Sequence, residues 1–260
     1  MNPIIYTIAR RELLESRRSR WLWLSSLLFA LLTLAVTFGS SAVAGQLQLP
    51  PLAQLLNSLV SLSCFLLPLI ALLLAADAFV SEAESGTMLL MLTYPISKSQ
   101  WLLGKLLGQG TALLLACLAG YGVLWLLPLW SSAISWQALW QPWLLLLGSG
   151  WLLALICLLV GYGISLKVRS RNQALAWVLL LWLLLVLLYD LVLLILAVAT
   201  DSHMAPEVLQ WLQLLNPASA FRLLNQHSSQ VPAFLLYLQP WLWLALLWFI
   251  VQRQFRLRQL

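Results

Sequence analysis

The chain has 260 residues, of which 62% are hydrophobic and only 8% are charged, and its formal net charge is +6. A soluble domain usually carries about 25% charged residues, so this composition excludes a soluble globular protein. Apolar runs of about 18 or more residues without a charge are typical of transmembrane helices. We therefore predict a polytopic helical membrane protein. The positive charge is explained below by membrane orientation, and no nucleic-acid partner is expected.

The first twenty residues are polar and rich in arginine. Apolar side chains recur there at helical spacing: Ile4, Ile5, Ile8, Ala9 and Leu13. The opposite face is expected to carry Arg10, Arg11, Glu12, Arg17 and Arg18. We predict an amphipathic interface helix over residues 1–20 that lies along the membrane surface, in contact with anionic headgroups. A plain positive flank of the first span is a compatible alternative, and no cleavable signal peptide is expected.

Six apolar segments follow this arm. The predicted spans cover residues 21–43, 55–76, 102–129, 143–166, 174–199 and 232–251. We find no internal repeat and no low-complexity linker, so we predict one all-α membrane domain over residues 1–260.

Positive charge gathers on one side of this six-span arrangement. The arm holds five arginines, the loop between spans two and three holds two lysines, and the next inner loop and the tail hold three cations each. Of the 14 Lys and Arg residues, only Arg222 lies on the other side. By the positive-inside rule both termini are cytoplasmic. Residues 200–231 are then external, which means periplasmic in a Gram-negative cell.

The loop between spans two and three has unusual local signals. Asp77, Glu82 and Glu84 are expected to carry the second span into water, and Gly86 is expected to break its helix. A short apolar helix should follow, with Ser85 or Thr87 available as caps. Pro95 should end that helix, and Ser97 with Gln100 forms an S-x-x-Q capping box for the next one. The short helix either docks on another protein, where methionines adapt well, or packs as an elbow on its own bundle.

These residues carry a family resemblance. EAESGTMLLMLTYPISK at 82–98, with LLGK at 102–105, resembles the loop of ABC-2 type transporter permeases that forms a coupling helix in a groove of the ATP-binding subunit. The arm IARRELLESRRSRWLW at 8–23 resembles the interface helix of that family. The resemblance implies that residues 77–100 are the cytoplasmic coupling loop of a permease in the bacterial inner membrane. The expected contact residues are Glu82, Glu84, Ser85, Gly86, Thr87, Met88, Leu89, Leu90, Met91, Leu92 and Pro95.

The resemblance also implies partners. They are two copies of a cytoplasmic ATP-binding subunit, a second copy of this chain and the lipid bilayer. The chain has no G-x-x-x-x-G-K-[ST] motif, so it is not expected to be an enzyme or to bind a cofactor, and ATP and Mg²⁺ belong to the partner. Two stretches, residues 58–97 and 214–225, more closely resemble permeases of assemblies that mature the copper sites of nitrous-oxide reductase. That closer resemblance implies a periplasmic subunit as well.

Asp190 lies deep in the fifth predicted span. A carboxylate there costs several kcal/mol unless it is neutralised or paired, so it marks a transport pathway or a bundle interior. The alternative is a protonated or hydrogen-bonded side chain at a helix or dimer contact.

Residues 200–231 predict two short amphipathic helices that resemble the re-entrant gate helices of ABC-2 permeases before the last span. The expected gate and partner surface consists of Trp211, Asn216, Pro217, Phe221 and Arg222. Three residues here are weak candidates for a soft metal: His203, Met204 and His227. A solvated loop explains them better, and we assign no metal ligand.

Two other classes of function stay open. A secondary transporter could use Asp190 and Asp77 for ion coupling, although the chain has no pair of broken hydrophobic helices. A membrane scaffold that moves no solute would also suit spans with so little polar lining.

Overall fold

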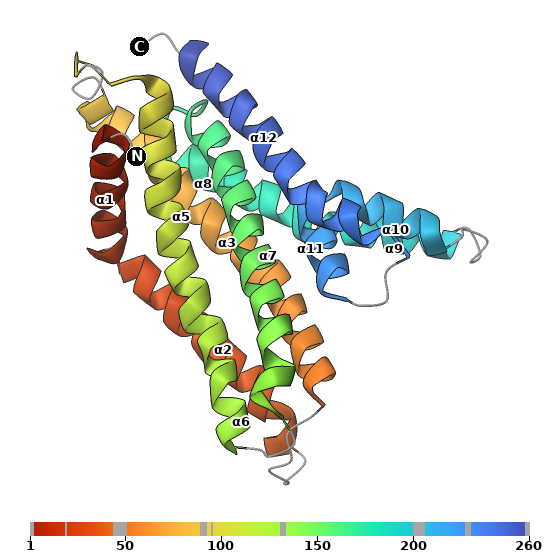
Figure 1. Cartoon of the computed structure of the whole chain (residues 1–260). Coiled ribbons are helices and arrows are strands. Elements are labelled where there is room, and N and C mark those ends of the chain that lie inside the picture. Colours follow the sequence, from red (N-terminus) through yellow and green to blue (C-terminus); the bar gives the residue numbers. More distant parts are fainter. Residues whose placement is uncertain are drawn as a thin grey trace.

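The computed structural model describes residues 3–18, 20–43, 51–88, 93–94, 96–130, 134–199, 206–226 and 230–257. Within these ranges it is helical and has no strand, which confirms the all-α prediction. The elements, shown in Figure 1, are α1 (Pro3–Arg18), α2 (Arg20–Val43), α3 (Leu52–Glu84), α5 (Lys98–Gly122), η1 (Val123–Leu126), α6 (Leu127–Trp130), α7 (Trp136–Ser165), α8 (Arg171–Trp182), the π-helix η2 (Leu183–Leu188), α9 (Tyr189–Ala199), α10 (Pro206–Leu215), α11 (Pro217–Asn225) and α12 (Ala233–Leu257).

Five of the described helical segments are long and apolar enough to cross a membrane: Leu52–Glu84, Lys98–Leu129, Trp136–Ser165, Arg171–Ala199 and Ala233–Leu257. The first predicted span coincides with α2, in which Ser26–Phe38 is a shorter apolar stretch. The two short helices expected before the last span are α10 and α11. The count of six spans, the orientation and the re-entrant position of α10 and α11 stay predictions.

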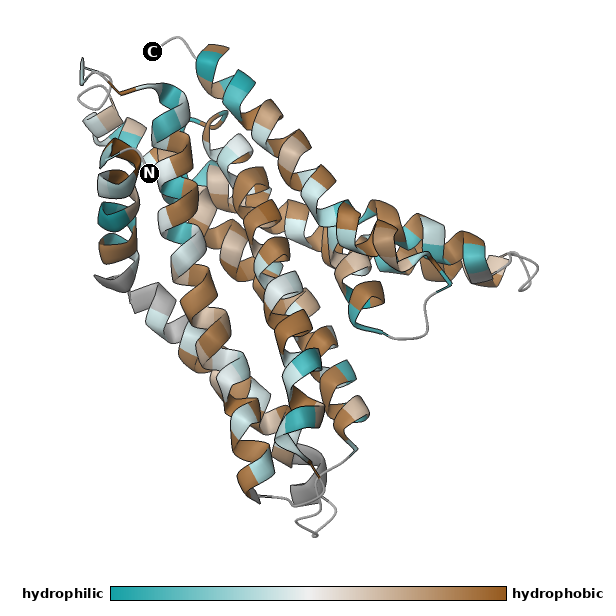
Figure 2. Cartoon of the chain, in the orientation of Figure 1, coloured by the Kyte–Doolittle hydropathy of each residue, from teal (hydrophilic) through white to brown (hydrophobic). Residues whose placement is uncertain are grey.

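The helices form two groups that meet at one end of the molecule. In Figure 1, α2, α3, α5 and α7 run together, while α8, η2, α9 and α12 lean away from them and α11 lies between the groups. The beginning of α1 and the end of α12 lie at the same end (Figure 1). Hydrophilic residues gather on α1 and at that end, whereas the long helices are mostly hydrophobic (Figure 2).

Helix α3 and the π-helix η2 are both irregular, and each accepts a hydrogen bond from a neighbouring side chain. Pro68 lies inside α3, and a proline removes one backbone hydrogen bond. The π-helix η2 also departs from regular pairing. The Trp182 indole donates to the Phe65 carbonyl at 3.0 Å, and the Asn216 amide donates to the Leu185 carbonyl at 2.6 Å. These bonds tie α8 to α3 and the N-cap of α11 to η2, beside the two irregular turns.

Helix α1 packs closely on α5. A Cβ atom added to Gly108 would lie 2.5 Å from the Glu12 Cβ and 2.7 Å from the Ala9 carbonyl oxygen. Small residues allow such close approach of helix backbones. The buried face of α1 consists of Ile8, Glu12 and Ser16. The prediction that Glu12 faces outward is therefore wrong, because a polar partner on α5 draws it inward.

Gly108→Ala should destabilise the protein by about 1–3 kcal/mol, because the new methyl group meets the α1 backbone. The measurement is thermal unfolding in detergent. Gly148→Ala is the control, since a Cβ there meets nothing within 4 Å, and it should be neutral or slightly stabilising. Equal melting temperatures for the two variants would contradict the close contact of α1 with α5.

Candidate coupling site

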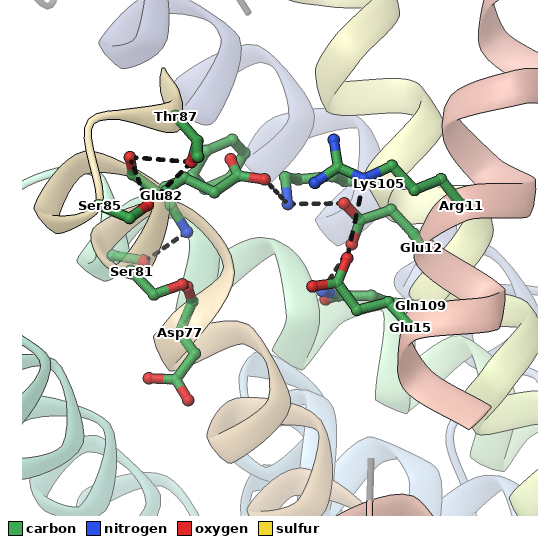
Figure 3. Close-up of polar contacts among 12 residues, drawn as sticks. Arg11, Glu12, Glu15, Asp77, Ser81, Glu82, Ser85, Thr87, Lys105 and Gln109 are labelled. Carbon is green, nitrogen blue, oxygen red and sulfur yellow. Dashed lines mark hydrogen bonds and ion pairs between the residues drawn. The ribbon is translucent and has the colours of Figure 1, made fainter. Parts of the chain in front are cut away.

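Three charged side chains meet inside the bundle, and we call Glu12, Glu82 and Lys105 the charge cluster (Figure 3). The Lys105 ammonium lies 2.8 Å from Glu12 Oε1 and 2.9 Å from Glu82 Oε1. The side chain of Lys105 is only 3% exposed, and those of Glu12 and Glu82 are 7% and 13% exposed. Buried charges of this kind persist only when they are paired. The cluster therefore holds α1, α3 and α5 together.

The polar contacts continue into a fourth helix. The Gln109 amide donates to Glu12 Oε2 at 3.3 Å. The Tyr162 hydroxyl of α7 donates to Gln109 Oε1 at 2.9 Å. The charge cluster is thus connected by hydrogen bonds to α7, which packs extensively on α3.

The helical first part of the coupling loop ends one turn after Glu82, at Gly86. Gly86 has φ = +72°, a left-handed conformation that glycine adopts without strain, so the predicted helix break is confirmed. The Ser85 and Thr87 hydroxyls each donate to the Glu82 carbonyl at 3.3 Å. Glu82 was expected in water, and that prediction is wrong because Lys105 holds it inside the bundle. Glu82 of the coupling loop is therefore also a member of the charge cluster.

The rest of the loop is described in part. Met88, expected on a contact face, is 1% exposed and belongs to the protein's own core. Leu89, Leu90, Met91, Leu92 and Pro95 lie outside the described residues. The predicted capping box is confirmed: Gln100 N donates to Ser97 Oγ at 3.2 Å, and Ser97 N donates to Gln100 Oε1 at 3.1 Å.

A second connection joins the end of α3 to the start of α8. The Arg171 guanidinium lies 2.6 Å from Asp77 Oδ2. The backbone N–H of Arg171 donates to Glu84 Oε1 at 3.0 Å. Glu84 therefore places a carboxylate at the N-terminus of α8, where the helix dipole favours negative charge. Of the predicted contact residues, Glu82 and Glu84 both have partners within this chain.

Asp190 forms an ion pair with Arg222, the one cation assigned to the external side. The Ser219 hydroxyl donates to Asp190 Oδ1 at 2.9 Å. Burial lowers the pKa of Arg222, but the hydrogen bond to Asp190 outweighs this effect, and the net shift is upward. Nothing in the spacing of Asp190 and Arg222 indicated that they pair.

The other external candidates differ in exposure. Trp211 is 46% exposed, whereas Asn216 and Phe221 are buried. The Asn216 side chain caps α11, with Pro217 in its first turn. His203, Met204 and His227 lie outside the described residues. Among the residues that are described, no group of three His, Cys, Asp or Glu side chains is close enough to hold a metal ion.

Comparison with known proteins identifies relatives of this chain. A family model described as "ABC-2 family transporter protein" matches residues 6–251. A "Probable ABC transporter permease protein NosY" of Pseudomonas aeruginosa is 44% identical over 228 residues, which cover 86% of this chain and 82% of the relative. A protein of the same name from Stutzerimonas stutzeri is 42% identical over 222 residues, which cover 85% and 80%.

Lys105→Met should destabilise the protein by about 3 kcal/mol or more, because two buried carboxylates lose their common partner. Thermal unfolding in detergent measures the effect. Arg11→Met is the control: it breaks an exposed pair, in which the Arg11 Nε lies 3.9 Å from Glu15 Oε2, and it should cost less than about 1 kcal/mol. Similar losses for both variants would show that the charge cluster contributes no more than a surface ion pair.

Proposed function

Because this chain belongs to the ABC-2 transporter family, we propose that its charge cluster transmits movement from a separate ATPase into the membrane. The family supplies the membrane subunit of an ABC transporter, which has no ATPase site of its own and works with an ATPase partner. Its apolar helices make this chain a multi-pass protein of the bacterial inner membrane.

The observation that carries the proposal is the position of Glu82. It lies at the end of α3, four residues before the hinge at Gly86, and it binds Lys105 of α5. When ATP binding closes the ATPase pair, the loop at 77–100 is displaced. Glu82 passes that displacement to Lys105 and to Glu12, because separating these charges in an apolar bundle is costly. Helices α1, α3 and α5 therefore move as one body.

The names of the relatives suggest the biological setting. The chain would act as the permease of a NosDFY-type assembly, with two NosF-like ATPase subunits, a NosD-like periplasmic subunit and a second copy of itself. ATP and Mg²⁺ would be bound by the ATPase subunits. The assembly would support maturation of the copper sites of nitrous-oxide reductase. Identities of 42–44% over most of the chain support this assignment.

Two alternatives differ in what they require. Ion coupling needs carboxylates that gain and lose a cation, yet Asp190 and Asp77 are each paired with an arginine. A membrane scaffold that moves no solute would have the same apolar spans. Only ATPase-dependent movement of this chain distinguishes the proposed function from that alternative.

Purification of the tagged chain from a denitrifying cell tests the assembly. We expect an ATPase and a periplasmic subunit to be recovered together with two copies of the chain. Recovery of the chain alone, as a monomer, would contradict the proposed function.

Leu90→Glu should uncouple the ATPase from maturation, because a charge would enter an apolar contact. ATPase activity in the reconstituted assembly and copper content of the reductase are the two measurements. Leu257→Glu is the control, since Leu257 is 69% exposed at the C-terminal end of α12. If Leu90→Glu keeps ATPase-coupled maturation at the level of the control, the loop is not the site of contact.

A further inference from the structure

An apolar cavity lies between the two groups of helices. Its volume is about 190 Å³, and it is partly open rather than sealed. Residues of α3, α7, α8, η2, α11 and α12 line it; the ones used below are Pro68, Leu72, Val160, Val186, Asn216 and Ala218. An apolar cavity of about 150 Å³ stays dry and binds small hydrocarbons such as benzene. This cavity is larger than that.

Two polar side chains in the lining are already hydrogen-bonded. Asn216 donates its amide hydrogen to the Leu185 carbonyl and accepts from the Ala218 N–H. The Trp182 indole, also in the lining, donates to the Phe65 carbonyl. A polar ligand would therefore lose its hydrogen bonds to water and gain few in return. The occupant must be a hydrocarbon.

The depth of the cavity indicates where that hydrocarbon comes from. Leu72 and Pro68 lie 10 and 14 residues before Glu82 in α3. At a rise of 1.5 Å per residue they are about 15–21 Å from the charge cluster. The hydrocarbon core of a bilayer is about 30 Å thick, so the cavity lies at the level of acyl chains and away from the headgroups.

Two of the surrounding spans face outward. Only 17% of the most apolar window is buried in each of Arg171–Ala199 and Ala233–Leu257. Both spans contribute residues to the cavity wall. The partly open cavity is thus bounded by the two spans that are least buried within the single chain.

We propose that this cavity binds the end of one acyl chain of a bilayer phospholipid. The chain enters between the two outward-facing spans and packs against Pro68, Leu72 and Val186. Ala218 of α11 forms part of the cavity wall, so the bound acyl chain packs against α11. The same helix carries Arg222, the partner of Asp190, and the lipid therefore stabilises the position of that ion pair.

Native mass spectrometry of the full chain, after washing with detergent, tests the proposal. The wild-type chain should retain one phospholipid per chain when 1-palmitoyl-2-oleoyl phosphatidylglycerol is supplied. Val186→Phe fills the cavity and should abolish that retention. Val192→Phe is the matched control, because Val192 belongs to the same span but is 60% exposed, and it should retain the lipid as the wild type does.

A second cavity-filling variant controls for a folding defect. Val160→Phe projects from α7, on another wall of the cavity, and should also lose the lipid. Retention by either filler with a wild-type melting temperature would overturn the proposal, as would a wild-type chain that retains no lipid. Dihexanoyl phosphatidylglycerol should not be retained, because its chains are too short to reach the cavity, and equal retention of this lipid would assign binding to the headgroup instead.

Discussion

The burial of Lys105 between two carboxylates is the constraint on which this structure depends. Lys105 lies two turns inside α5 and is 3% exposed, so its charge has no access to water. The energy of such a group is acceptable only while Glu12 and Glu82 remain within hydrogen-bonding distance. Any movement of the coupling loop must therefore either carry three helices together or break the pair at a large cost. A bundle held together by apolar contacts alone would lack this constraint, because apolar contacts have little directional preference and allow helices to slide past one another.

The same principle of paired irregularities recurs where the two groups of helices meet. Pro68 and the π-helix η2 would each disturb backbone pairing within the membrane, and Trp182 and Asn216 reach carbonyl groups beside them. Asp190 and Arg222 likewise compensate each other. The charge cluster thus ties α1 to α3 and α5, and polar groups of α8 and α11 tie the two groups of helices together. The apolar cavity lies beside Pro68, Trp182 and Asn216, which form part of its wall.

Local signals in the chain predicted the elements well. The break at Gly86, the capping box at Ser97 and Gln100 and the two helices that meet at Asn216 each depend on neighbouring residues only. The burial of Glu12 and Glu82 could not be predicted in this way, since their partner is 93 and 23 residues distant along the chain. Glu12 is polar, and polarity alone suggests that its side chain faces outward. The pairing of Asp190 with Arg222 could not be predicted for the same reason, since the two residues are 32 positions apart.

The spacing of the charge cluster along the chain also has a consequence for biogenesis. Glu82 and Lys105 belong to successive long helices, so this pair is neutral within the hairpin of α3 and α5. Glu12 comes from α1, at the start of the chain, and adds the second carboxylate. If the hairpin inserts as a neutral pair, the cluster is completed only when α1 docks on it. Assembly of this protein would then end with the helix that was made first.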